Sequence, residues 1–123
     1  MKILLIDDEP SVLSMVEKML RFDGHEVVPA NDGEEGMRLL AEEADIELVI
    51  TDLIMPNKEG IETIMEIRQV QPNVKILAMS GGGRGGANTY LSAAKSIGAD
   101  ATLSKPFLRQ DLIDAVNNLK TKD

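Results

Sequence analysis

The chain has 123 residues, which suits one folded domain, and its 21 acidic and 13 basic residues give a net charge of −8. This charge argues against direct binding of nucleic acid and against attraction to anionic membranes. The absence of cysteine excludes disulfides and thiolate metal sites, and no apolar run is long enough to span a bilayer, so a cytoplasmic location fits the sequence.

The first half of the chain alternates apolar strands with amphipathic helices. The expected elements are a strand over 2–6, a helix from Pro10 to Asp23-Gly24, a short strand over 25–30, and a helix that Asn31 and Asp32 cap. The first strand runs directly into two adjacent acids, Asp7 and Asp8. Pro29 predicts an edge position for the second strand, because proline cannot donate to a neighbouring strand.

The strand over 48–52 is a continuous apolar run that ends in a single carboxylate, Asp52. Such a run is consistent with a strand buried on both faces, as parallel sheets require. The next helix is expected from about Lys58 and stops before Pro72.

The last third of the chain repeats this design twice. The expected elements are a strand over 75–80 ending in Ser80, a glycine-rich segment over 81–86, a helix over 87–97, a strand over 101–105 ending in Lys105, and a final helix after Phe107. Pro106 fixes a turn after Lys105, and a cis bond would suit it.

Five strands alternating with five helices predict an α/β fold with a parallel sheet covered on both faces. The chain stops with its last helix, so we expect a single domain over 1–123. In open parallel sheets, ligands bind at the carboxyl ends of the strands. The residues expected at that edge are Asp7, Asp8, Asp52, Ser80 and Lys105.

Three carboxylates gathered at one edge favour a bound cation. At about 5 Å, each pair repels by roughly 3 kcal/mol at an effective dielectric near 20. Oxygen ligands select Mg²⁺, Mn²⁺ or Ca²⁺ rather than zinc, and Mg²⁺ commonly completes its shell with phosphate oxygens. An ammonium and a hydroxyl nearby suit a phosphoryl group, and aspartate is itself a competent nucleophile.

These motifs together resemble the receiver domain of two-component response regulators. The resemblance rests on Asp7-Asp8 after a strand, on Asp52-Leu-Ile-Met-Pro with Gly60, on Ser80, and on Lys105-Pro106-Phe107. It covers essentially the whole chain in the same order. It implies a flavodoxin-like, doubly wound (βα)5 fold with strand order 2-1-3-4-5.

The resemblance also implies the role of each residue. Asp52 would accept a phosphoryl group from a histidine kinase or phosphotransfer protein, and Ser80 and Lys105 would contact the phosphate. Asp7, Asp8, Asp52 and the backbone carbonyl of Ile54 would bind Mg²⁺, for which Mn²⁺ would substitute. The chain would be a signalling domain that catalyses its own phosphorylation and dephosphorylation, not an enzyme acting on other substrates.

Two positions depart from the family pattern. Thr102 stands three residues before Lys105, where receivers usually carry a Tyr or Phe that reorients on activation together with the residue matching Ser80. Without an aromatic side chain there, this switch must work differently, and Tyr90 on the helix after Ser80 is the substitute that the sequence offers. The glycine-rich segment 81–86 is longer than usual, and we expect phosphorylation to order it and to move the following helix.

The methionines, including Met15, Met19, Met37 and Met65, are expected to fill the core.

We therefore expect a single-domain response regulator whose output passes to an unknown downstream protein through its fourth helix, fifth strand and fifth helix. It would neither bind nucleic acid directly nor insert into a membrane, and a phosphorylation-dependent dimer remains open. One alternative is an Mg²⁺-dependent phosphatase with an aspartyl-phosphate intermediate; Ile54 disfavours it, because such enzymes usually carry an acid there. A flavodoxin-like cofactor binder is disfavoured by the shortage of aromatic residues.

Overall fold

A computed structural model describes residues 1–53, 60–81 and 87–120, and side chains within these ranges except those of 87–91. The elements are β1 (Lys2–Ile6), α1 (Pro10–Phe22), β2 (Glu26–Ala30), α2 (Gly33–Glu42), β3 (Leu48–Asp52), α3 (Gly60–Val70), β4 (Lys75–Gly81), α4 (Ala87–Ser96), β5 (Ala101–Lys105) and α5 (Arg109–Lys120). In these ranges no helix is long and apolar enough to cross a membrane.

The five strands form one parallel sheet in the order β2-β1-β3-β4-β5, which confirms the predicted topology. The central strand β3 is buried along its whole length, as its apolar run indicated. Pro29 lies in β2, which is an edge strand as predicted. The fourth strand extends one residue beyond Ser80, to Gly81.

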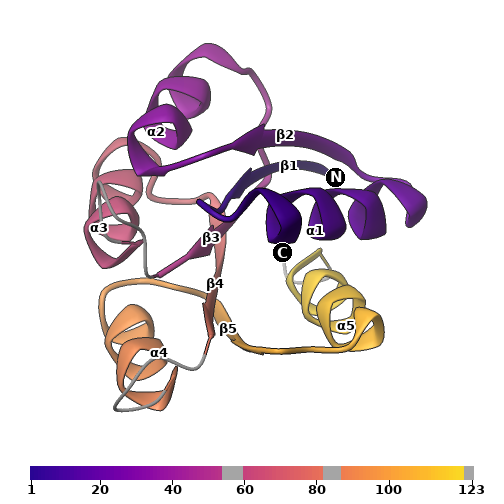
Figure 1. The fold of residues 1–123 in the computed structure, drawn as a ribbon. Helices are drawn as coiled ribbons and strands as arrows, with labels where there is room; N and C mark the ends of the chain where they lie inside the picture. Colours follow the sequence, from indigo (N-terminus) through magenta and orange to yellow (C-terminus); the bar gives the residue numbers. More distant parts are fainter. Residues whose placement is uncertain (54–59, 82–86, 121–123) are drawn as a thin grey trace.

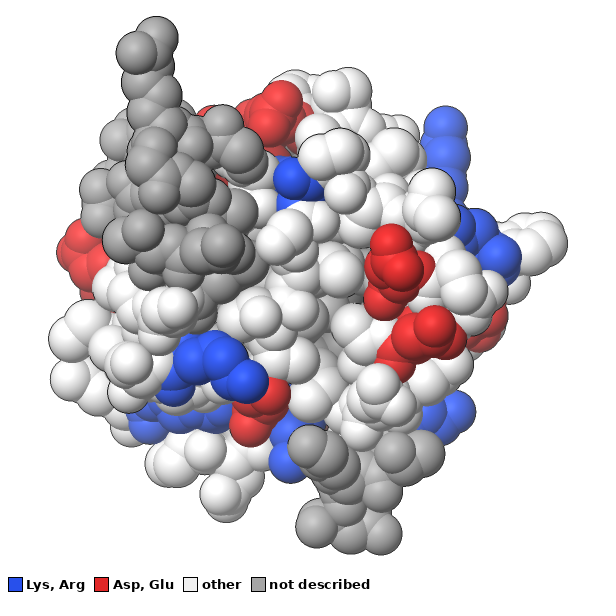
Figure 2. Space-filling view, turned by 90° about the horizontal axis from the view of Figure 1, so that it is seen from below, with Lys and Arg blue, Asp and Glu red and all other residues white. Residues whose placement is uncertain are grey.

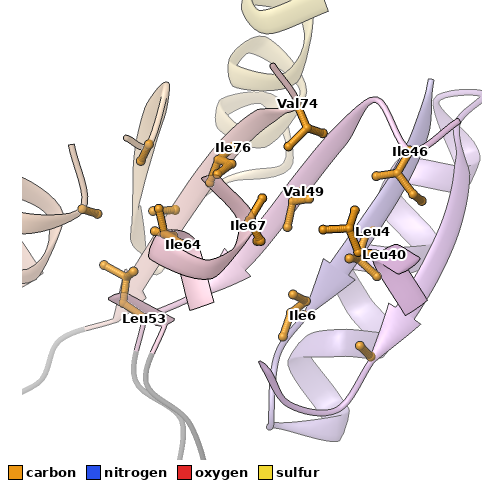
Figure 3. Packing of buried hydrophobic residues seen from close by; sticks show 14 residues of the cluster. Leu4, Ile6, Leu40, Ile46, Val49, Leu53, Ile64, Ile67, Val74 and Ile76 are labelled. Carbon is orange, nitrogen blue, oxygen red and sulfur yellow. The ribbon is translucent and has the colours of Figure 1, made fainter. Parts of the chain in front are cut away.

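Helices cover both faces of the sheet (Figure 1). Helices α2, α3 and α4 lie on one face, and α1 and α5 lie on the other. Figure 3 shows the core of the first face, where Ile64 and Ile67 of α3 pack over Val49 and Ile76 of the sheet. Because both faces are sealed by apolar side chains, polar side chains of the strands reach solvent mainly at the strand ends.

Local signals set the helix ends as the sequence indicated. The Asp32 carboxylate caps α2 by accepting a hydrogen bond of 2.8 Å from the Glu35 amide. Pro10 is the first residue of α1, where its missing N–H costs nothing. Gly24, just beyond that helix, has a φ of +92°, a conformation that glycine adopts without strain.

The expectation that the methionines fill the core is wrong for two of them. Met15 is 43% exposed and Met65 is 49% exposed, whereas Met19 and Met37 pack against the core. The buried face of α1 is formed by Leu13, Val16 and Leu20, and Met15 falls outside that stripe. On α3, Met65 is displaced in the same way from the buried face around Ile64 and Ile67.

Gly60 is needed for the close approach of α3 to the end of β3. A methyl group there would meet the backbone carbonyl oxygen of Asp52 and the Cα of Leu53. The Gly60 amide also donates a hydrogen bond of 3.0 Å to the Leu53 carbonyl. The glycine therefore fixes the backbone that carries Asp52.

We predict that Gly60→Ala lowers the free energy of unfolding by about 2 kcal/mol, because backbone atoms cannot rotate away from the added methyl group. Urea unfolding measures the change. Glu62→Ala, at an exposed position in the same helical turn, is the matched control and should change stability by less than about 0.5 kcal/mol. Equal effects of the two substitutions would contradict the close approach.

Candidate phosphoacceptor and metal site

The sheet brings the predicted site residues to one edge. Asp7 and Asp8 directly follow β1, and Asp52 is the last residue of β3. Ser80 is the last residue but one of β4, and Lys105 ends the neighbouring strand β5, where Gly81 pairs in register with Lys105. The described residues of the predicted site therefore share the carboxyl edge of the sheet.

Asp7, Asp8 and Asp52 form a compact acidic cluster in which one carboxylate oxygen from each lies within 4.8 Å of the others. Asp7 is fully buried, and Asp52 is 4% exposed. Two hydrogen bonds with the backbone orient Asp7. The Asp7 amide donates to the Ala30 carbonyl, and Oδ1 of Asp7 accepts from the Glu9 amide at 3.0 Å. The cluster is thus a fixed feature of the strand ends.

The Lys105 ammonium neutralises part of this charge. Its Nζ lies 2.9 Å from Oδ2 of Asp7 and 3.3 Å from Oδ1 of Asp52. Gly81 makes room for the lysine, because a Cβ at that position would lie 3.0 Å from the Lys105 Cβ. The peptide bond between Lys105 and Pro106 is cis, as the sequence suggested.

Burial controls the ionisation of the Asp52 carboxyl. Desolvation raises the pKa of Asp52 to about 6; Lys105 opposes this rise, and the charges of Asp7 and Asp8 add to it. For Lys105, burial alone would lower the pKa, but the hydrogen bond to Asp7 and the charge of Asp52 outweigh it, so the pKa is raised. At neutral pH the site therefore holds an ionised but poorly solvated carboxylate beside a permanent cation.

Ser80 adds an unused hydrogen-bond donor. It is fully buried, and its hydroxyl has no hydrogen-bond partner among the residues that the structure describes. A buried hydroxyl without a partner is costly and calls for an explanation. A ligand oxygen at this edge of the sheet would supply the missing acceptor.

The donor set fits a hard divalent cation. Carboxylate oxygens are ligands that Mg²⁺ prefers, and the three acids bring one such oxygen each to within 4.8 Å of the others. The Ile54 carbonyl, predicted as a further ligand, lies outside the described residues, as do segment 82–86 and the Tyr90 side chain. Thr102 is partly buried in β5, opposite Ala78.

One feature of the site was not foreseen. The sequence assigned Lys105 to a phosphate, whereas in the structure its ammonium rests between Asp7 and Asp52. The spacing of the motifs carries no signal for this ion pair, because it joins residues 98 positions apart. The role of Gly81 in making room for the lysine was missed for the same reason.

The model of the response regulator receiver domain family matches residues 3–117. The chain belongs to this family. Receiver domains are signalling domains of two-component systems, and this membership weakens the alternative of a phosphatase that acts on small substrates.

The receiver resembles curated transcriptional regulators over part of their length. It is 35% identical to the transcriptional regulatory protein CpxR of Klebsiella pneumoniae over 112 residues, which are 91% of this chain and 46% of CpxR. It is 33% identical to GlrR of Escherichia coli over 94% of this chain and 25% of that protein. The chain therefore spans about half, or a quarter, of the length of these relatives.

Solved structures agree with the fold. A response regulator receiver domain protein of Clostridium thermocellum is 36% identical, with a TM-score of 0.89 over 96% of this chain and 92% of its own. The regulator TrrA of Thermotoga maritima, in complex with Mg²⁺ and BeF, is 30% identical, with a TM-score of 0.84 over 96% of this receiver and 97% of its own chain.

We predict that the raised pKa of Asp52 makes the metal-free receiver less stable as the pH rises. Below pH 3.8 the carboxyl is protonated in both the folded and the unfolded state; between 3.8 and about 6 only the folded state keeps the proton. Relative to Asp52→Asn, the free energy of unfolding of the wild type should fall by up to about 3 kcal/mol from pH 4 to pH 7. Urea unfolding in EDTA measures it, and a constant difference between the two proteins would contradict it.

Proposed function

We propose that Asp52 is the phosphoacceptor of this receiver and takes a phosphoryl group from a histidine kinase or a phosphotransfer protein. The observation that carries the proposal is the environment of Asp52. Its carboxylate is buried, has a pKa of about 6, and lies 3.3 Å from the Lys105 ammonium within a cluster of three acids. This arrangement suits a nucleophile whose target carries several negative charges.

In the proposed reaction, an Asp52 carboxylate oxygen attacks the phosphorus of a phosphohistidine. The new P–O bond forms as the P–N bond breaks, and the imidazole nitrogen leaves with the electron pair of that bond. A poorly solvated carboxylate loses little hydration when it attacks, and its raised pKa makes it a better nucleophile while it remains ionised at neutral pH. Water reverses the modification by hydrolysing the acyl phosphate.

Lys105 and Ser80 supply charge and hydrogen bonds to the phosphoryl group. The Lys105 ammonium already lies between Asp7 and Asp52. A change in its side-chain torsion would direct it to an oxygen of the phosphoryl group bound to Asp52. The Ser80 hydroxyl, which has no partner in the described part of the chain, would donate to a second oxygen. Each contact stabilises charge on the transferring group.

Asp7, Asp8 and Asp52, together with the Ile54 carbonyl, would hold Mg²⁺, and Mn²⁺ would substitute for it. When bound, the ion neutralises the phosphoryl oxygens and the carboxylate cluster. The complex of TrrA with Mg²⁺ and BeF supports this assignment by family likeness.

We predict that acetyl phosphate labels this protein at Asp52 and only in the presence of a divalent metal, because the acids must be neutralised before an anionic donor enters. Borohydride trapping followed by mass spectrometry identifies the residue. Asp52→Asn should abolish the label, whereas Asp32→Asn, at a helix cap outside the site, should keep it. Label on another residue, or undiminished label in excess EDTA, would refute the assignment.

The phosphodonor protein needs a surface beside Lys105, and an apolar hollow lies there. It has a volume of about 480 Å³ and is lined by Glu9, Val12, Met15, Gly81, Lys105, Pro106 and Phe107. Met15 on its rim is 43% exposed, and Leu108, which follows Phe107, is 72% exposed. Exposed apolar side chains around a buried reactive group suit contact with a partner protein.

We predict that Met15→Glu slows phosphotransfer from a histidine kinase about tenfold or more while leaving labelling by acetyl phosphate unchanged, because only the protein donor contacts this surface. The kinase is the one that phosphotransfer profiling pairs with the wild type. Met65→Glu is the matched control, since Met65 is similarly exposed on the other face of the sheet. Equal transfer rates for the two variants would place the docking surface elsewhere.

The output would pass through the face formed by α4, β5 and α5. Figure 2 views the molecule from this side and shows a largely uncharged centre with separate acidic and basic groups around it. The edge strand β5 lies there, and Thr102 is only partly buried in it. Such a face suits a protein partner or a phosphorylation-dependent dimer better than nucleic acid.

A cytoplasmic location and action without an attached output domain remain predictions.

A further inference from the structure

A polar network outside the phosphoacceptor site joins α3, α4 and the starts of two strands. It centres on the guanidinium of Arg68, in the last turn of α3. Its partners belong to the segment before β4 and to the turn between α4 and β5. Because the strands are parallel, this network lies at the edge of the sheet opposite to Asp52.

Arg68 uses all three of its nitrogens in this network. Nε and Nη2 donate to the Gly98 carbonyl at 3.0 and 2.7 Å, and Nη2 also donates to Oδ2 of Asp100 at 2.7 Å. Nη1 donates to the carbonyls of Pro72 and Val74. The side chain is 20% exposed. A planar guanidinium with this many partners holds them in one geometry, which a lysine cannot do.

Asp100 extends the network into the sheet. Its Oδ2 accepts a hydrogen bond of 2.8 Å from the Ile76 amide, and its own amide donates to the Ile76 carbonyl at 2.8 Å. The start of β5 is thereby tied to the start of β4 by side chain and backbone together.

Gly98 fits this arrangement in two ways. Its φ of +124° is one that glycine adopts readily. A Cβ there would lie 2.9 Å from Nε and 3.0 Å from Cγ of Arg68. The turn that ends α4 is therefore held directly against the guanidinium.

We propose that Arg68 and Asp100 form a clamp that holds the C-terminal end of α4, so that α4 responds to phosphorylation by pivoting about its clamped end near Gly98. This inference rests on the proposed function, since it describes how a change at Asp52 reaches the output face.

The two ends of α4 lie at opposite edges of the sheet. The N-terminal end follows β4 on the side of Ser80 and Asp52, where a phosphoryl group would make new contacts. The C-terminal end is bound to Arg68, whose other partners do not belong to the site. A helix pulled at one end and held at the other changes its direction more than its position.

Spin-label distances test the pivot, and the absence of cysteine allows labels at chosen positions only. One label at Ser14, exposed on α1 across the sheet, serves as the reference. The second label replaces either Asn88 in the first turn of α4 or Ser96 at its end. With beryllofluoride and Mg²⁺, the Ser14–Asn88 distance should shift and the Ser14–Ser96 distance should not.

Breaking the clamp should release the second end. In Arg68→Met, the Ser14–Ser96 distribution should broaden without any ligand and shift when beryllofluoride binds; Arg68→Lys should behave similarly, because an ammonium cannot reach the same carbonyls together. The Ile76 and Asp100 amides should exchange roughly tenfold faster or more. Arg38→Met removes an exposed arginine that, among the described residues, forms ion pairs only within α2; it is the matched control and should change nothing.

An equal shift of Ser96 and Asn88 in the wild type would overturn the pivot. A narrow Ser14–Ser96 distribution and unchanged Ile76 protection in Arg68→Met would overturn the clamp. If Arg68→Met does not fold, Asp100→Asn, which keeps an acceptor for the Ile76 amide, should show a weaker effect of the same sign. Borohydride trapping and mass spectrometry of the same proteins after treatment with acetyl phosphate report failure of the proposed function separately, and the ligand-free comparison of the wild type with Arg68→Met still decides the clamp.

Discussion

The burial of the Asp52 carboxylate beside two other acids is the constraint on which the rest of the site depends. Such a group is expensive in a folded protein, because burial removes its hydration and the neighbouring charges repel it. The Lys105 ammonium offsets part of that cost by contacting both Asp7 and Asp52. The same excess of negative charge that makes the resting site unfavourable favours a divalent cation in it.

The sheet makes this arrangement stable enough to persist. The acids follow strands that are buried on both faces, so the backbone beneath them is fixed by apolar packing from α1 and α5 on one side and α2, α3 and α4 on the other. Gly60 lets α3 approach the end of β3, and Gly81 makes room for the lysine. At the opposite edge, Arg68 ties the helix turn after α4 to the sheet. The site and the anchor of α4 thus lie at opposite ends of the same strands.

The sequence predicted the gathering of the site residues, because it follows from apolar runs that end in polar residues, whereas the strand order was implied by the resemblance to receiver domains. It did not predict that Lys105 forms ion pairs with Asp7 and Asp52 in the unphosphorylated protein, since these pairs depend on distances between strands that are far apart in the chain. The exposure of Met15 was misjudged because a helical stripe defined by spacing includes residues at its margin. The partners of Arg68 are mostly backbone carbonyls, which leave no mark in the sequence.

Titration of the Asp52 carboxyl by carbon-13 NMR, in metal-free protein, tests directly whether burial raises the pKa of this group. We expect a pKa of about 6 in the wild type and a higher pKa in Lys105→Met, because the lysine opposes the effect of burial. An ordinary pKa near 4 in the wild type would show that burial does not perturb Asp52, and the same pKa in both proteins would show that Lys105 does not act on it.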